Sequence, residues 1–107
     1  MSWSDACDSD KISYEALSML YGQNENLFHF LMNPDNPRLT ATSDRIKYNS
    51  GVLSSGEQLL IRVGLDIWDG SGGITFNELY QKLDEKNFQK IILVLLFLRA
   101  PKKAELY

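Results

Sequence analysis

The chain has 107 residues, of which 44% are hydrophobic and 23% charged, and its formal net charge is −3. This length allows one domain with a single core, and the composition is that of a globular protein, not of a disordered or fibrous one. A net charge this small gives no strong positive field, which argues against a protein built to bind nucleic acid.

The first half of the chain predicts three helices. Residues 11–21 and 27–32 each place apolar side chains on one face, the pattern of an amphipathic helix. Ser43 can cap a third, short helix that runs through Tyr48. The prolines between the second and third helices predict a loop there.

The fourth predicted helix begins with a capping box, in which a serine and a glutamate or glutamine satisfy each other's backbone N–H groups. Two registers are open, Ser54 with Glu57 or Ser55 with Gln58. The apolar pattern carries this helix to about residue 69, and the glycine that follows predicts its end.

Two more helices follow. Thr75 and Glu78 form a further capping box, which opens a helix over residues 76–83, and Asp84 can cap a last helix over residues 85–99. The last helix is apolar on every side from residue 91 to residue 98, and such a helix must be covered all round. A strand over the same eight residues is the alternative, because a short apolar run cannot be assigned by its period alone.

These elements predict an all-α fold, a compact bundle of five or six short helices with a central apolar C-terminal helix. We expect a single domain over residues 1–107, with residues 1–9 and 100–107 as frayed ends. The longest apolar run has eight residues, whereas a membrane span needs about 20, so no membrane association is expected. The single cysteine, Cys7, excludes an internal disulfide and suits the cytoplasm.

Residues 67–79, with the sequence IWDGSGGITFNEL, nearly fill a calcium-binding template. With Ile67 at the first ligand position, Asp69, Ser71 and Glu78 fall at the third, fifth and twelfth, and a glycine falls at the sixth. The stretch therefore resembles an EF-hand loop.

The departure from that template lies at its first position, where Ile67 has no oxygen to offer a hard cation that needs six to eight of them. Asp66 could supply the missing ligand only in a loop one residue longer. The same residues are explained by one helix ending and the next beginning, so we expect no metal and no cofactor here. If the calcium alternative holds, the ligands are Asp66, Asp69, Ser71 and Glu78.

A second alternative is a DNA-binding helix-turn-helix. The helix over residues 76–83 would offer Asn77, Gln81 and Lys82 to bases or phosphates. It carries only one basic residue, and phosphate contacts normally dominate DNA affinity, so nucleic acid binding is not the favoured prediction.

Charge is distributed unevenly along the chain. Residues 1–36 hold six acidic side chains and one basic one, whereas residues 37–107 hold eight acidic and ten basic ones. An acidic first third could dock on its own domain or face a basic partner. The candidate partner-binding residues are Trp3, Asp5, Asp8, Asp10, Tyr14 and Tyr21, with core packing as the alternative for the tyrosines.

No cluster of catalytic residues is evident, and the only histidine, His29, is interpreted as a half-buried packing residue between two phenylalanines. We therefore predict a non-enzymatic cytoplasmic protein–protein interaction module. It would be an adaptor, or an inhibitor of the kind that mobile elements or phages encode. Because the two longest helices carry more apolar surface than their short neighbours can cover, a homodimer is also predicted.

Overall fold

The computed structural model describes residues 8–22, 24–33, 35 and 38–99. Within these residues six α-helices and one 3₁₀ turn form the structure, and the one β-type pairing is an isolated bridge between Met32 and Leu39. This confirms the all-α prediction. In chain order the elements are α1 (Asp8–Tyr21), α2 (Glu25–Leu31), α3 (Ser43–Asn49), η2 (Ser50–Val52), α4 (Ser55–Asp69), α5 (Phe76–Lys82) and α6 (Glu85–Arg99).

The predicted capping groups set the starts and ends of the later helices. The Ser54 hydroxyl accepts the N–H of Glu57 at 3.2 Å, and the Glu57 carboxylate accepts the N–H of Ser54 at 3.1 Å, so the first of the two registers is correct. Gly70 ends α4 with a φ of 77°, a left-handed conformation that costs glycine little. Asp84 caps α6 by accepting the N–H of Asn87 at 3.0 Å.

Several predicted boundaries differ from the structure. The first helix begins at Asp8 and not at residue 11, the second spans Glu25–Leu31 and not residues 27–32, and the fifth ends at Lys82 and not at residue 83. The N-cap of α3 is Thr42, whose hydroxyl accepts the N–H of Arg45 at 3.3 Å, and Ser43 is the first helical residue. The frayed N-terminus is predicted to extend to residue 9, but α1 begins at Asp8. Two acidic side chains in its first turn interact favourably with the positive end of the helix dipole and so stabilise this start. Residues 1–7 and 100–107 lie outside the described residues.

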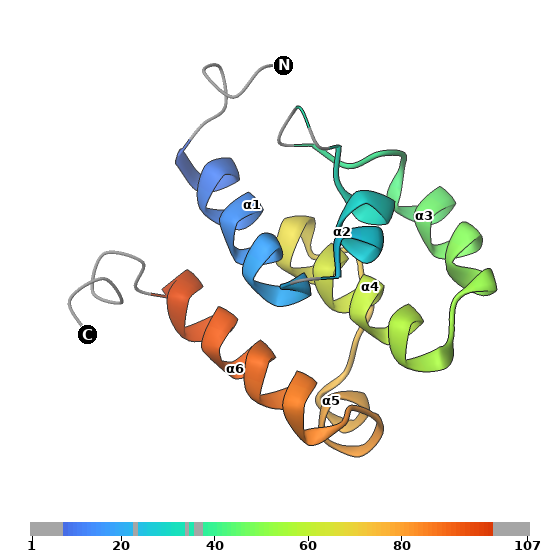
Figure 1. Ribbon diagram of the computed structural model, residues 1–107, viewed down its shortest axis with the longest axis vertical. Helices are drawn as coiled ribbons and strands as arrows, with labels where there is room; N and C mark the ends of the chain where they lie inside the picture. The colour runs from blue at the N-terminus through green and yellow to red at the C-terminus, as the bar shows by residue number, and fades with distance from the viewer. Residues whose placement is uncertain (1–7, 23, 34, 36–37, 100–107) are drawn as a thin grey trace.

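The centre of the bundle is α4, which packs against α1, α2 and α3 (Figure 1). Six of its residues are buried, more than in any other described helix. Tyr21 of α1 reaches into this core, where its hydroxyl donates a hydrogen bond to the carbonyl oxygen of Leu60 at 3.1 Å. Burial raises the pKa of Tyr21 well above its ordinary value, so the phenol stays neutral and continues to donate this bond.

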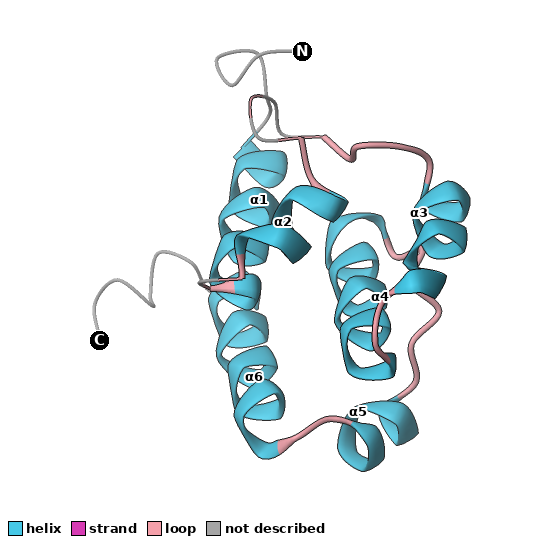
Figure 2. Ribbon diagram, turned by 45° about the vertical axis from the view of Figure 1, so that its right-hand side comes forward, coloured by secondary structure: helices cyan, strands magenta, loops and turns pink. Residues whose placement is uncertain are grey.

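The prediction that the C-terminal helix is central is wrong. α6 packs along α1 at the edge of the bundle (Figures 1 and 2), and only Ile91 and Val94 of its residues are buried. The physical reason is that too few helices remain to pack around α6. The short helices α2 and α3 pack on α4, which leaves α1 as the main neighbour of α6.

The assignment of His29 also needs correction. Its side chain is exposed, and its ring lies edge-on to Phe28 with 6.0 Å between ring centroids. None of the helices in the described part of the chain is long and apolar enough to cross a membrane.

Candidate functional site

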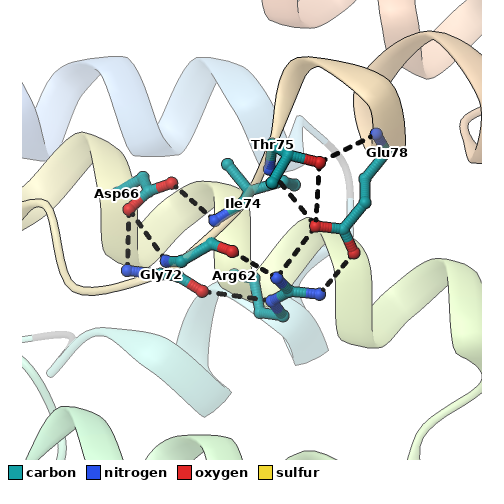
Figure 3. Close-up of polar contacts among 7 residues, drawn as sticks. Arg62, Asp66, Gly72, Ile74, Thr75 and Glu78 are labelled. Carbon is teal, nitrogen blue, oxygen red and sulfur yellow. Dashed lines mark hydrogen bonds and ion pairs between the residues drawn. The ribbon is translucent and has the colours of Figure 1, made fainter.

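One carboxylate organises the turn over residues 70–75, between α4 and α5. The Oδ1 atom of Asp66 accepts the N–H of Gly72 at 2.7 Å and that of Gly73 at 3.2 Å (Figure 3). Its Oδ2 atom accepts the N–H of Ile74 at 3.1 Å. Asp66 therefore gives three consecutive amides of the turn an acceptor.

A guanidinium group faces the same turn from the preceding turn of α4. Arg62 donates from Nε to the carbonyl oxygen of Gly72 at 3.1 Å and from Nη2 to that of Gly73. It also donates to both carboxylate oxygens of Glu78, from Nη1 at 2.7 Å and from Nη2 at 3.0 Å. This bidentate pair joins α4 to the first turn of α5 (Figure 3).

The Arg62 contacts bear directly on the EF-hand resemblance. In that loop the seventh position supplies a backbone carbonyl to calcium and the twelfth a bidentate glutamate. In this chain those positions are Gly73 and Glu78, and both bind the guanidinium of Arg62. An internal cation thus holds two groups that the template assigns to the metal.

The other candidate ligands are arranged for turn formation. Asp69 accepts the N–H of Ser71 at 3.0 Å, while the Ser71 hydroxyl is buried without a hydrogen bond. Across the residues that the structure describes, no three histidine, cysteine, aspartate or glutamate side chains gather as a metal site would require.

The ion pair also sets the charge state of Glu78. The hydrogen bond from Arg62 is the main cause that holds the pKa of this carboxyl below its ordinary value of 4.5. Partial burial raises the pKa, and the backbone N–H of Thr75 and the charges of Arg62 and Lys82 lower it further. Glu78 is therefore anionic at neutral pH, and the pair with Arg62 is fully ionised.

We expect calcium to leave the stability of the protein unchanged. Only a ligand that binds the native state adds stability, and here Arg62 already engages the Glu78 carboxylate. Thermal unfolding with and without millimolar Ca²⁺, and with Mg²⁺ as the control, measures this. A midpoint that rises by several degrees with Ca²⁺ alone would show that the turn does bind the ion.

Sequence reasoning overlooked Arg62. A signal was present, because Arg62 and Asp66 are four residues apart near the end of a predicted helix and therefore share one face. Two opposite charges on that face, just before a glycine-rich turn, indicate side chains that can bind the carbonyls and amides of the turn.

A second feature is an apolar surface on α6, which we call the outer α6 face. It comprises Ile92, Leu93, Leu95 and Leu96, which are 42%, 62%, 48% and 59% exposed. No charged side chain lies between residues 91 and 98. The face runs along the edge of the bundle, on the side of α6 turned away from the core.

An apolar groove of about 590 Å³ adjoins the outer α6 face at Leu95, between α4, α5 and α6. Ile67 and Leu79 are among its lining residues, and Phe76, which is 85% exposed, lies at its edge. Asp66 also lines the groove, but both of its carboxylate oxygens accept backbone N–H groups of the turn. Apolar surface therefore extends from α6 to the start of α5.

Four of the six candidate partner-binding residues of the first third are described by the structure, and all four lie on α1. Trp3 and Asp5 lie outside the described residues, whereas Asp8 is exposed and Asp10 half-buried in the first turn of α1. Tyr21 is in the core, which removes it from the surface candidates.

Tyr14, the remaining candidate, is half-buried, and its ring packs edge-on against Phe28, with 5.2 Å between the ring centroids. Its hydroxyl donates to the carbonyl oxygen of Asn33 at 3.5 Å. Burial, followed by the charge of Asp35, raises the pKa of Tyr14, so the phenol stays neutral and can donate this bond. The ring contact with Phe28 gives this residue a packing role as well.

The residues proposed for DNA contact are at the surface. Asn77, Gln81 and Lys82 are all exposed on α5, where the Asn77 amide donates to the Tyr80 hydroxyl at 3.2 Å. α5 has only seven residues, and Lys82 is its only basic one. This short helix gives little surface for reading a groove of DNA.

Comparisons of the chain with protein-family models, with curated protein sequences and with solved structures found no significant match. The function must therefore be inferred from the turn and from the apolar surface themselves.

Proposed function

We propose that the protein is a non-enzymatic protein–protein interaction module and that the outer α6 face is its binding surface. The observation that carries this proposal is the exposure of four large aliphatic side chains on successive turns of one helix. Monomeric proteins rarely expose a contiguous apolar patch above a few hundred Å², and larger patches mark interaction sites.

The composition of the surface favours a protein as the partner. Interface centres are depleted in charged residues, and the outer α6 face contains none. Aromatic residues are frequent anchors of binding energy, and Phe76 is 85% exposed beside the adjoining groove.

The simplest partner is a second copy of the chain, because identical apolar faces can cover each other across a two-fold axis. We further propose that the protein acts in the cytoplasm, as an adaptor or as an inhibitor of the kind that mobile elements or phages encode. The single cysteine supports a reducing compartment.

Light scattering at micromolar concentration tests this proposal. We expect a mass of twice the 12.2 kDa of one chain for the wild type, and the mass of one chain for Leu96→Glu, which places a charge within the face.

Val52→Glu is the matched control, since Val52 is 87% exposed on η2, away from the outer α6 face. This variant should keep the wild-type mass. A wild type that remains a monomer, or a loss of the dimer in both variants, would contradict the proposed surface.

A further inference from the structure

We infer that the second copy covers the outer α6 face with its own α6 helix, and that the two helices run antiparallel and cross at Ile92. This inference rests on the proposed function and specifies its interface. Three observations support it: two residues of opposite charge lie at the ends of the face, the helix dipoles favour antiparallel neighbours, and the face exposes a large apolar area.

The outer α6 face has a charged residue of opposite sign at each end. Glu85 lies seven residues before Ile92 and Arg99 seven residues after it, and both are exposed. Seven residues are almost two turns of an α-helix, so the three side chains point in nearly the same direction. At 1.5 Å per residue, each charge lies about 10 Å along the helix from Ile92.

A two-fold axis at Ile92 makes these charges complementary. In the antiparallel arrangement Glu85 of each chain faces Arg99 of the other copy, at both ends of the interface. In a parallel arrangement Glu85 would face Glu85 and Arg99 would face Arg99, which is repulsive. The helix dipoles also favour antiparallel neighbours, because each positive end then meets a negative one.

The orientation of the Glu85 side chain fits this role. The Gln89 amide donates to its Oε1 atom at 2.8 Å, one helical turn further along α6. This bond directs the carboxylate along the side of the helix that also bears Ile92 and Leu96. The charge is therefore held beside the apolar surface that it flanks.

The exposed apolar area approaches the apolar share of a dimer interface. The four residues of the outer α6 face, together with Phe76 at the adjoining groove, which is 85% exposed, present a large share of their surface to solvent. At roughly 150–250 Å² for a large side chain, their exposed fractions amount to on the order of 500 Å². A stable interface of standard size buries about 800 Å² on each partner, of which roughly 65% is apolar in homodimers.

Two charge-reversal variants test the arrangement. Glu85→Arg places Arg against Arg at both ends of an antiparallel dimer, and Arg99→Glu places Glu against Glu. We expect each change alone to raise the dimer dissociation constant at least tenfold in low salt, because two attractive pairs become repulsive. The double variant Glu85→Arg with Arg99→Glu should restore the wild-type constant, and high salt should reduce all these differences.

Mixing the two single variants provides a further check. The mixed dimer has an attractive pair at both ends, so it should form more tightly than either variant alone. Sedimentation equilibrium of each variant and of the equimolar mixture gives these constants.

A crosslinking experiment separates the antiparallel from the parallel arrangement. In a Cys7→Ser background, Ile92→Cys should form an interchain disulfide, since the two copies of this position meet on the axis. Glu85→Cys should not, because its two copies are about 20 Å apart along antiparallel helices. Efficient crosslinking at position 85 would overturn the antiparallel arrangement.

The outcomes distinguish this inference from the proposed function. If the wild type is a dimer that Leu96→Glu dissociates, but neither charge reversal weakens it, the outer α6 face is the binding surface and the antiparallel pairing is wrong. If the wild type is a monomer at all concentrations, both the homodimer and the pairing are wrong.

Discussion

Replacing Gly72 with alanine is expected to destabilise the fold by about 2–4 kcal/mol. Gly72 is buried where the turn passes over α4, and an added Cβ would overlap the carbonyl oxygen of Arg62. It would also lie 2.8 Å from the Arg62 carbonyl carbon and 2.9 Å from Cγ of Asp66. The clash is with helix backbone, which cannot turn aside as a flexible side chain can. Urea unfolding at a fixed protein concentration measures the loss.

The neighbouring glycine is the matched control for this substitution. Gly73 has a φ of +68°, and no atom lies within 4 Å of the position that its Cβ would take. Gly73→Ala therefore carries only the left-handed backbone penalty of about 1–2 kcal/mol. Equal losses for the two variants would show that the clash with Arg62 does not determine the need for glycine at position 72.

Replacing Asp66 with alanine is expected to cost about 2–4 kcal/mol, because three amides of the turn lose their acceptor together. Two of these amides belong to residues that are buried or half-buried, Gly72 and Ile74, so water cannot replace the carboxylate fully.

Asp66→Asn provides the comparison for this change. Asparagine keeps one oxygen acceptor of similar shape but presents an NH₂ group in place of the other. Its loss of stability should therefore be smaller than that of the alanine variant. If Asp66→Ala unfolds at the wild-type urea concentration, the turn does not depend on this carboxylate.

The starts of α4, α5 and α6 could be predicted well from the sequence, because capping depends on a few neighbouring residues, whereas the starts of α1 and α2 were predicted two or three residues too late. Ser54 and Thr75 each have a glutamate three residues later, and both capping boxes form in the structure. Gly70 ends α4 where the apolar pattern stops. These signals are local, and tertiary packing did not override them.

The arrangement of the helices could not be predicted in the same way. The apolar sequence of α6 indicates how much apolar surface must be buried, but it does not specify whether helices of the same chain bury it. At Gly64 the absence of a side chain lets Tyr21 of α1 and Leu31 of α2 approach α4 closely, so α1 and α2 pack on α4, and α6 remains at the edge. The assumption that an apolar helix must be central therefore failed.

The two parts of the candidate site differ in how far the sequence could predict them. Asp66 and Glu78 were singled out as possible metal ligands, yet their hydrogen-bond partners are backbone amides and Arg62. The sequence shows the residue types and the spacing of Asp66 and Glu78. It does not show that Arg62, from an earlier turn of α4, pairs with Glu78. The outer α6 face was visible only as an uninterrupted apolar run.

Hydrogen exchange of the wild-type protein at two concentrations tests the proposed binding surface most directly, since it requires no substitution. Raising the protein from nanomolar to micromolar concentration, across the range in which the dimer forms, should slow amide exchange in α6, and to a lesser degree in α5, while exchange in α3 stays unchanged. Exchange rates that are independent of concentration throughout, or a slowing confined to α3 and η2 around the exposed Tyr48 and Val52, would contradict a binding surface on α6.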